Sequence, residues 1–204
     1  AYKLLYMNNL FSNLFSPFKR NKGFAIFLAI ATIVVIVLGI VSAVQFDDSV
    51  LIIDLENVTY IRYLKGDSSF GGFLFGTFIS VLIFFFIVVI CSCKKYLLPL
   101  AVVFYLYLVY SQFVIFTCIL LIYGFFNTLI FLLFLLVYFL ALYVLFILLF
   151  LSLTNLCGQT NFFRSCFNRD SNILILLILF LLLVLAFALI LMFLKSYIIL
   201  LIYW

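Results

Sequence analysis

Long runs of Leu, Ile, Val and Phe recur along the 204 residues of the chain and are separated by short polar stretches. Uncharged apolar runs of 18 or more residues are typical of transmembrane helices, which need about 20 residues to cross a bilayer. The pattern predicts an all-α fold, a polytopic membrane helix bundle with five transmembrane helices. The expected spans are residues 24–44, 72–92, 97–122, 128–151 and 173–194.

The polar stretches between these runs define the parts of the chain outside the bilayer. The apolar region between Tyr96 and Leu153 is long enough for two spans, and Gly124 marks the expected tight turn between them, since glycine readily ends a helix. The other segments are a basic cytoplasmic N-terminal segment, an acidic extracytoplasmic segment, a cytoplasmic loop and an interfacial tail: residues 1–23, 45–71, 152–172 and 195–204.

The placement of Lys and Arg predicts the orientation, because short loops rich in these residues are retained on the cytoplasmic side. Five spans place the N-terminus, the turn after the second span and the loop at 152–172 on one side. That side holds eight of the eleven basic residues, whereas the other holds Arg62, Lys65 and Lys195. The N-terminus is therefore expected inside and the C-terminus outside.

The segment at 45–71 is the largest expected piece outside the membrane. Its β-branched runs at 50–53 and 58–61 permit a hairpin, and a surface helix is the alternative, since short apolar runs are ambiguous. About 27 residues bury little core alone, so the segment is expected to lean on the membrane or on a partner. The carboxylates expected at the rim of such a docking surface are Asp47, Asp48, Asp54 and Glu56.

Composition narrows the class of protein and of chemistry. Apolar residues make up 71% of the chain and charged residues 8%, which excludes an ordinary soluble domain. Histidine is absent, and no acid or base lies within the five expected spans. Ion-coupled transport normally places ionisable groups at membrane depth, so movement of charge by the bundle itself is disfavoured. No motif predicts a catalytic residue, a cofactor, a metal site or nucleic-acid binding.

Two stripes of side chains stand out within the spans. Small residues recur every four positions at the start of the second span, where they allow close helix packing, within the bundle or against a second copy. Polar residues gather in the third span, where they predict either a small cavity or an interhelical hydrogen bond. The first stripe is Ser68, Gly72, Gly76 and Ser80, and the second is Tyr105, Tyr107, Ser111 and Gln112.

Three short segments resemble a known family. They are Tyr63-Leu64-Lys65-Gly66-Asp67, Leu97-Leu98-Pro99-Leu100 and Ile122-Tyr123-Gly124-Phe125-Phe126. With the order of anchor, outer segment and four further spans, the chain resembles stage II sporulation protein M and its relatives. The resemblance implies a non-enzymatic inner-membrane scaffold that recruits membrane-anchored wall hydrolases.

The sequence thus predicts a non-enzymatic membrane scaffold that contacts lipid and recruits protein partners in the membrane or at its outer face. A small permease or transporter subunit for a neutral solute is the alternative, and a mitochondrially encoded respiratory subunit is the second alternative. The expected location is a bacterial plasma membrane, with the mitochondrial inner membrane as the alternative.

Overall fold

The computed structural model describes residues 20–45, 58–157, 162–166 and 172–202, with side chains for all of these except residues 125–127, 163–164 and 196–202. The regular structure of the described residues is entirely α-helical. Five helices are long and apolar enough to cross a membrane, which confirms the predicted all-α membrane fold. The helices are α2 (Lys22–Gln45), α4 (Thr59–Lys65), α5 (Phe70–Cys91), α6 (Leu98–Tyr123), α7 (Phe125–Leu156), α8 (Phe162–Cys166) and α9 (Asn172–Ile202).

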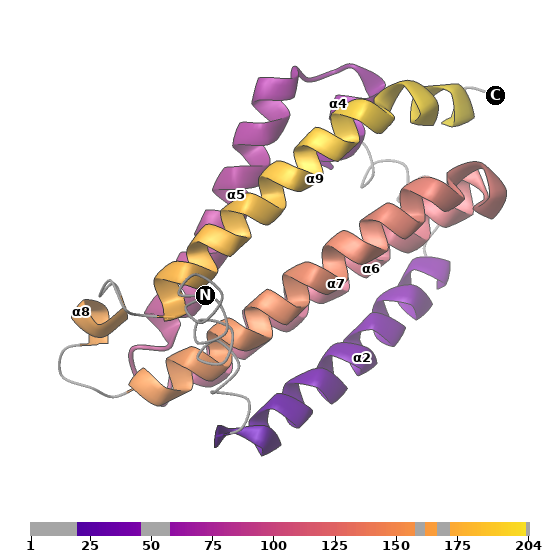
Figure 1. Cartoon of the computed structure of the whole chain (residues 1–204). Coiled ribbons are helices and arrows are strands. Elements are labelled where there is room, and N and C mark those ends of the chain that lie inside the picture. The colour runs from indigo at the N-terminus through magenta and orange to yellow at the C-terminus, as the bar shows by residue number, and fades with distance from the viewer. Residues whose placement is uncertain (1–19, 46–57, 158–161, 167–171, 203–204) are drawn as a thin grey trace, which may run out of the picture.

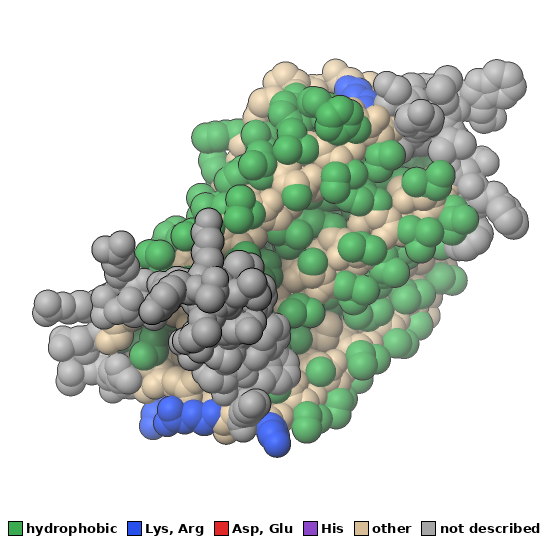
Figure 2. Space-filling view, in the orientation of Figure 1, with side chains coloured by type: hydrophobic (Ala, Val, Ile, Leu, Met, Phe, Trp, Pro, Cys, Tyr) green, Lys and Arg blue, Asp and Glu red, His purple; other side chains and the backbone are tan. Residues whose placement is uncertain are grey.

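The five long helices run alternately in opposite directions (Figure 1). Helix α6 packs against α5 and α7, α9 packs against α5 and α7, and α2 covers the outer side of α6. The short helices mark the two ends of the bundle, which we name the α4 end and the α8 end. Figure 2 shows apolar side chains along the flank and the visible Lys and Arg side chains near the ends, as expected for a molecule surrounded by lipid.

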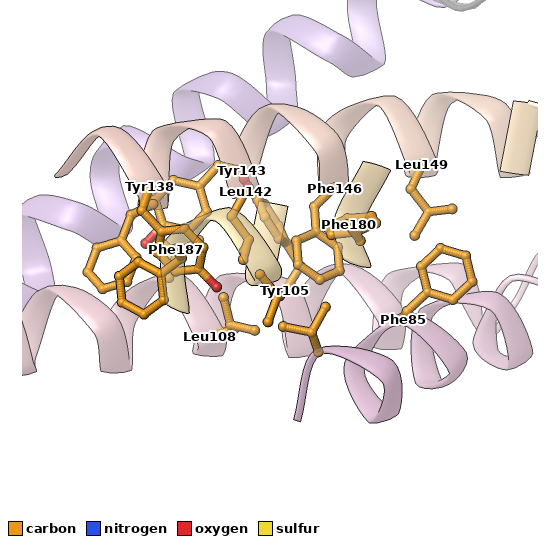
Figure 3. Close-up of a cluster of buried hydrophobic side chains, with 14 of the residues drawn as sticks. Phe85, Tyr105, Leu108, Tyr138, Leu142, Tyr143, Phe146, Leu149, Phe180 and Phe187 are labelled. Atoms are coloured by element: carbon orange, nitrogen blue, oxygen red, sulfur yellow. The ribbon is translucent and has the colours of Figure 1, made fainter. Parts of the chain in front are cut away.

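Aromatic side chains fill the centre of the bundle (Figure 3). The ring centroids of Phe146 and Phe180 lie 4.7 Å apart, and those of Tyr138 and Phe187 lie 4.0 Å apart, so α7 and α9 meet through ring contacts. Tyr105 brings α6 into the same core, with its ring 5.8 Å from that of Phe146. Rings of this size contribute many dispersion contacts, which replace the hydrophobic effect between helices within lipid.

Helices α7 and α9 extend past the expected spans. Helix α7 continues five residues beyond the expected end at 151, and α9 continues into the expected tail at 195–204. At the end of α7, the hydroxyl of Ser152 donates to the carbonyl of Leu148 at 2.8 Å, and the amide of Asn155 donates to the carbonyl of Leu151 at 3.1 Å. Because these side chains bond back to the helix, the polar residues expected in a loop continue the helix instead.

A single glycine joins α6 to α7. Gly124 has φ 78° and ψ 154°, a conformation that residues with a Cβ rarely adopt. Its N–H donates to the carbonyl of Leu120 at 3.1 Å, and its own carbonyl accepts the hydroxyl of Thr128 at 2.7 Å. The tight turn expected at Gly124 therefore closes both helices with local hydrogen bonds.

Residues 59–65 form helix α4, so the second strand of the possible hairpin does not form and the helical alternative holds there. The first expected strand, at 50–53, lies outside the described residues. Ile61, Tyr63 and Leu64 are all buried, which a strand with alternating faces would not allow. The ammonium of Lys195 on α9 donates to the carbonyl of Tyr63 at 2.8 Å and lies 4.2 Å from the centre of its ring. These contacts hold α4 against the bundle.

Small residues allow α2 to approach α6 closely. The buried positions of α2 form one stripe at helical spacing: Ala25, Leu28, Thr32, Gly39 and Ala43.

At Gly39 of this stripe, a Cβ atom would lie 3.0 Å from the carbonyl oxygen of Tyr110 and 3.2 Å from the Cβ of Phe113. Thr32 gives its hydroxyl proton to the carbonyl of Leu28, so the hydroxyl of Tyr105, 2.9 Å away, donates to Thr32. Close packing and one buried hydrogen bond thus join α2 to α6.

We expect Gly39→Leu to lower the free energy of unfolding by about 1–3 kcal/mol, because the added side chain overpacks the contact with α6. Thermal unfolding in detergent, followed by circular dichroism, measures the change. Gly23→Leu on the same helix is the matched control, since nothing lies within 4 Å of its Cβ position. Equal unfolding temperatures for the two variants would contradict close packing at Gly39.

The orientation is tested at Cys157, which is half-buried at the α8 end. In a variant that keeps Cys157 as its only cysteine, an impermeant maleimide should label opened membranes and leave intact cells unlabelled. The reason is the excess of basic residues expected on that side. Labelling of intact cells would reverse the predicted orientation.

Candidate functional site

The described residues enclose a pocket of about 340 Å³ between α5, α6, α7 and α9, with α4 at one end. Gln112 lies near the midpoint of α6, so the pocket reaches membrane depth. The walls are largely apolar, and the apolar residues are Val58, Val81, Phe84, Leu108, Ile115, Phe139, Leu142, Phe146 and Phe187. The polar residues are Thr59, Tyr60, Thr77, Ser80, Ser111, Gln112 and Tyr138.

The pocket reaches the surface between α5 and α6. Ser80 on α5 is exposed, and Phe84 and Ser111 are half-buried. In contrast, the wall formed by Tyr138 and Leu142 of α7 is buried. In a bilayer this opening faces lipid, so a molecule dissolved in the membrane can enter from the side.

Gln112 belongs to both an interhelical hydrogen bond and the pocket wall. The hydroxyl of Tyr143 on α7 donates to Oε1 of Gln112 at 2.7 Å. This bond joins α6 to α7 and fixes the amide orientation, so the Nε2 group of Gln112 keeps two N–H donors. Among the described residues no hydrogen bond from this nitrogen is found. Both expectations for the polar stripe, a packing bond and a cavity, therefore coincide at one residue.

Tyr60 of α4 contributes a buried hydroxyl without a hydrogen-bond partner among the described residues. Its ring packs edge-on against Phe131 and Phe187, with centroids 6.2 and 6.3 Å apart. Burial raises the pKa of Tyr60, and the neighbouring Tyr138 and Cys118 raise it further, so the hydroxyl stays protonated. A buried polar group without a partner costs about 1–3 kcal/mol, which makes this hydroxyl a candidate contact for a ligand.

Three other hydroxyls on the pocket wall donate their protons to the backbone. Thr77 donates to the carbonyl of Phe73 at 2.9 Å, and Ser80 donates to the carbonyl of Gly76 at 2.9 Å. Ser111 donates to the carbonyl of Leu108 at 3.0 Å. Each of these hydroxyls therefore presents only acceptor lone pairs to the pocket.

The structure separates the other members of the predicted polar stripe. Tyr105 is 1% exposed and belongs to the aromatic core and the bond with Thr32, whereas Tyr107 is 63% exposed on the lipid-facing side. Ser111 and Gln112 line the pocket together. Two of the four predicted residues thus lie at the site.

The stripe of small residues lies beside α4 and the pocket. A Cβ at Gly76 would approach the side chain of Thr59 at 3.3 Å, and one at Gly72 would approach only its neighbour Ser69 within 4 Å. The hydroxyl of Ser68 is buried without a hydrogen-bond partner in the described part of the chain. Ser80 lines the pocket. Packing along this stripe stays a prediction.

The predicted docking residues lie outside the described residues. Asp47, Asp48, Asp54 and Glu56 all fall within 46–57, so docking of an extracytoplasmic partner stays a prediction. Ile61, in the described part of the expected outer segment, is buried within this chain, against its own bundle. That side chain is therefore part of the core.

Four polar residues of the pocket were not predicted from the sequence to lie at a site within the bundle: Thr59, Tyr60, Thr77 and Tyr138. Tyr138 carried a usable signal, because it lies well inside the fourth span rather than at the membrane interface where Tyr is enriched. Nothing in the sequence distinguishes Thr77 from other threonines whose hydroxyl donates to a carbonyl of their own helix. Tyr60 belongs to the segment outside the spans, and its position depends on how α4 folds back.

Cysteines gather at the α8 end without forming a metal site. All five cysteines lie in the described residues, none forms a disulfide, and no group of three or more ligating side chains is found there. Burial raises the pKa of Cys93, with a smaller effect of Cys157, and burial together with Cys93 raises the pKa of Cys166 to about 11. Thiols with raised pKa values are poor nucleophiles, so Cys93 and Cys166 are expected to react slowly.

We expect Cys166 to be alkylated slowly at pH 8. Because its pKa is about 11 instead of the usual 9, the reactive thiolate is roughly 100-fold scarcer, and the rate should rise about tenfold per pH unit up to that pKa. Iodoacetamide labelling of a variant that keeps only Cys166, followed by mass spectrometry, measures this rate. The same variant unfolded in detergent is the control, and equal rates at pH 8 would contradict a buried thiol.

No family model, curated protein or solved structure matches the chain. The likeness to stage II sporulation protein M therefore stays a prediction based on three short segments. In the structure those segments lie at the end of α4, the start of α6 and the turn between α6 and α7. The pocket is the feature of the described residues that bears on function.

Proposed function

We propose that the chain binds a neutral, largely apolar molecule within the membrane. The observation that carries this proposal is the pocket of about 340 Å³, which combines apolar walls with a few polar groups at Gln112, Tyr138 and Tyr60. Pockets of about 300–1,000 Å³ with this mixture are typical of small-molecule sites. Binding of this kind is the step that a small permease or transporter subunit for a neutral solute must perform.

The chemistry of the walls supports a neutral ligand. Among the described residues, those that line the pocket include no Asp, Glu, Lys or Arg. A charged ligand would lose its hydration without gaining a counter-charge, which is costly in a low-dielectric interior. The proposed role is therefore binding, and the proposed host membrane is a bacterial plasma membrane or, alternatively, a mitochondrial inner membrane.

We expect a small, neutral phenyl diazirine to photolabel the buried pocket wall. Leu142 is 1% exposed, so a probe dissolved in the bilayer must enter the pocket to reach it. Peptide mapping by mass spectrometry after irradiation in nanodiscs locates the labelled residues. Labelling at Leu142 should fall at least about fivefold in Ser111→Trp, because the indole fills the pocket.

Val103→Trp is the matched control, since Val103 lies on the same helix and is 60% exposed. In that variant the probe should label Leu142 as strongly as in the original protein. In both tryptophan variants the probe should still label the lipid-facing residues of α5. Absence of label at Leu142 in the original protein, or equal labelling in the two variants, would contradict a ligand-accessible pocket.

A further inference from the structure

The hydrogen-bonding groups of the pocket fall into two kinds. Donors come from α4, α6 and α7: the hydroxyl of Tyr60, the Nε2 amide of Gln112 and the hydroxyl of Tyr138. In the described part of the chain none of these groups has found an acceptor. Because the residues that carry these three donors come from three helices and line one pocket, the partner that suits them is an acceptor oxygen, such as a carbonyl.

At the mouth of the pocket the wall offers acceptors, so a ligand must supply a donor there. Thr77, Ser80 and Ser111 have donated their protons to backbone carbonyls, so their oxygens can only accept a further hydrogen bond. These residues belong to α5 and α6, between which the pocket opens. A ligand that satisfies both regions therefore carries acceptor oxygens and at least one hydroxyl.

The size and position of the pocket limit the rest of the ligand. A volume of about 340 Å³ suits a polar end of small size, and it is too small for whole lipid chains. The opening leads to the lipid-facing surface at Ser80 and Phe84, so apolar chains can stay in the bilayer while the polar end enters. The ligand is thus a lipid whose polar end carries no charge.

We propose that the pocket binds a neutral glyceride of the diacylglycerol class, with its ester carbonyls toward Gln112, Tyr60 and Tyr138 and its free hydroxyl toward Thr77, Ser80 and Ser111. This assignment rests on the proposed function, because it names the ligand of the same pocket. The class combines the three required features: two carbonyl acceptors, one hydroxyl donor and chains that remain in the membrane.

Other common membrane lipids lack one of these features. A phospholipid carries a phosphate, for which the pocket supplies no Lys or Arg. A triacylglycerol or a quinone without a hydroxyl offers carbonyls and leaves the acceptors at the mouth unused. A polyprenol offers a single hydroxyl oxygen as its acceptor, whereas the pocket residues carry donors at Tyr60, Gln112 and Tyr138. The pattern of donors and acceptors therefore ranks these lipids below diacylglycerol.

The test uses the full chain in phosphatidylcholine nanodiscs with a diacylglycerol that carries a diazirine near its glycerol. Irradiation and peptide mapping locate the crosslink, and unlabelled dioleoylglycerol, trioleoylglycerol, a polyprenol and a quinone compete for it. Crosslinks are expected on the pocket residues of α6 and α7. Dioleoylglycerol should compete at a concentration at least about tenfold lower than the other three lipids.

Variants that remove single hydroxyls test the assigned contacts. Tyr60→Phe and Tyr138→Phe keep the rings and should each weaken competition by dioleoylglycerol about three- to tenfold, as expected for loss of one hydrogen bond within a membrane protein. Tyr107→Phe is the matched control, because Tyr107 is 63% exposed on the lipid-facing side, and it should leave competition unchanged. Circular dichroism of each variant verifies that the helices are intact.

The outcomes separate this inference from the proposed function. If the phenyl diazirine labels Leu142 in a manner sensitive to Ser111→Trp and the diacylglycerol probe does not crosslink there, the pocket binds another molecule and the glyceride assignment is wrong. Equal competition by trioleoylglycerol, or no effect of Tyr60→Phe and Tyr138→Phe, also overturns it. If neither probe labels the pocket, both the assignment and the proposed function fail.

Discussion

Hydrocarbon offers no hydrogen-bond partner, so every polar side chain in a span must find one within the bundle or remain unsatisfied at a cost. This constraint explains the placement of most hydroxyls in the structure. Serine and threonine at membrane depth donate to a backbone carbonyl of the preceding turn, and this group includes Thr32, Thr77, Ser80, Ser92, Ser111, Thr117 and Ser152. Two further bonds join helices, from Tyr105 to Thr32 and from Tyr143 to Gln112.

Three of the groups without a hydrogen-bond partner among the described residues belong to one pocket, whereas the buried hydroxyl of Ser68 lies outside it. Tyr60, Tyr138 and the amide of Gln112 border the same pocket, although they come from three different helices. A bundle selected only for stability would be expected to replace them, since Phe at either tyrosine position keeps the ring and removes the unpaired hydroxyl. Their convergence is the reason to interpret the pocket as a binding site rather than as a packing defect.

The sequence predicted the spans well and the helix faces poorly, for one physical reason. Apolar runs without charge establish which segments cross the membrane, and the helices found there follow from run length alone. The same runs are apolar on all sides, so little distinguishes a lipid-facing residue from a core residue. Tyr105 is 1% exposed, whereas Tyr107, two positions later in α6, is 63% exposed. Gln112 could be identified from the sequence because an amide at membrane depth needs a hydrogen-bond partner. The place of Tyr60 at the pocket could not, because it depends on how α4 packs against the bundle.

The position of α4 determines whether the pocket has its full set of donors. Helix α4 is outside the spans, yet Lys195 bonds to the carbonyl of Tyr63, and the ring of Tyr63 stacks on Phe73 with centroids 5.0 Å apart. These contacts keep Tyr60 at the pocket against the cost of its unpaired hydroxyl. A ligand that accepts a hydrogen bond from Tyr60 removes that cost, so binding and the docking of α4 must favour each other by the same free energy. Helix α4 is thereby connected, through Tyr60, to the pocket at membrane depth.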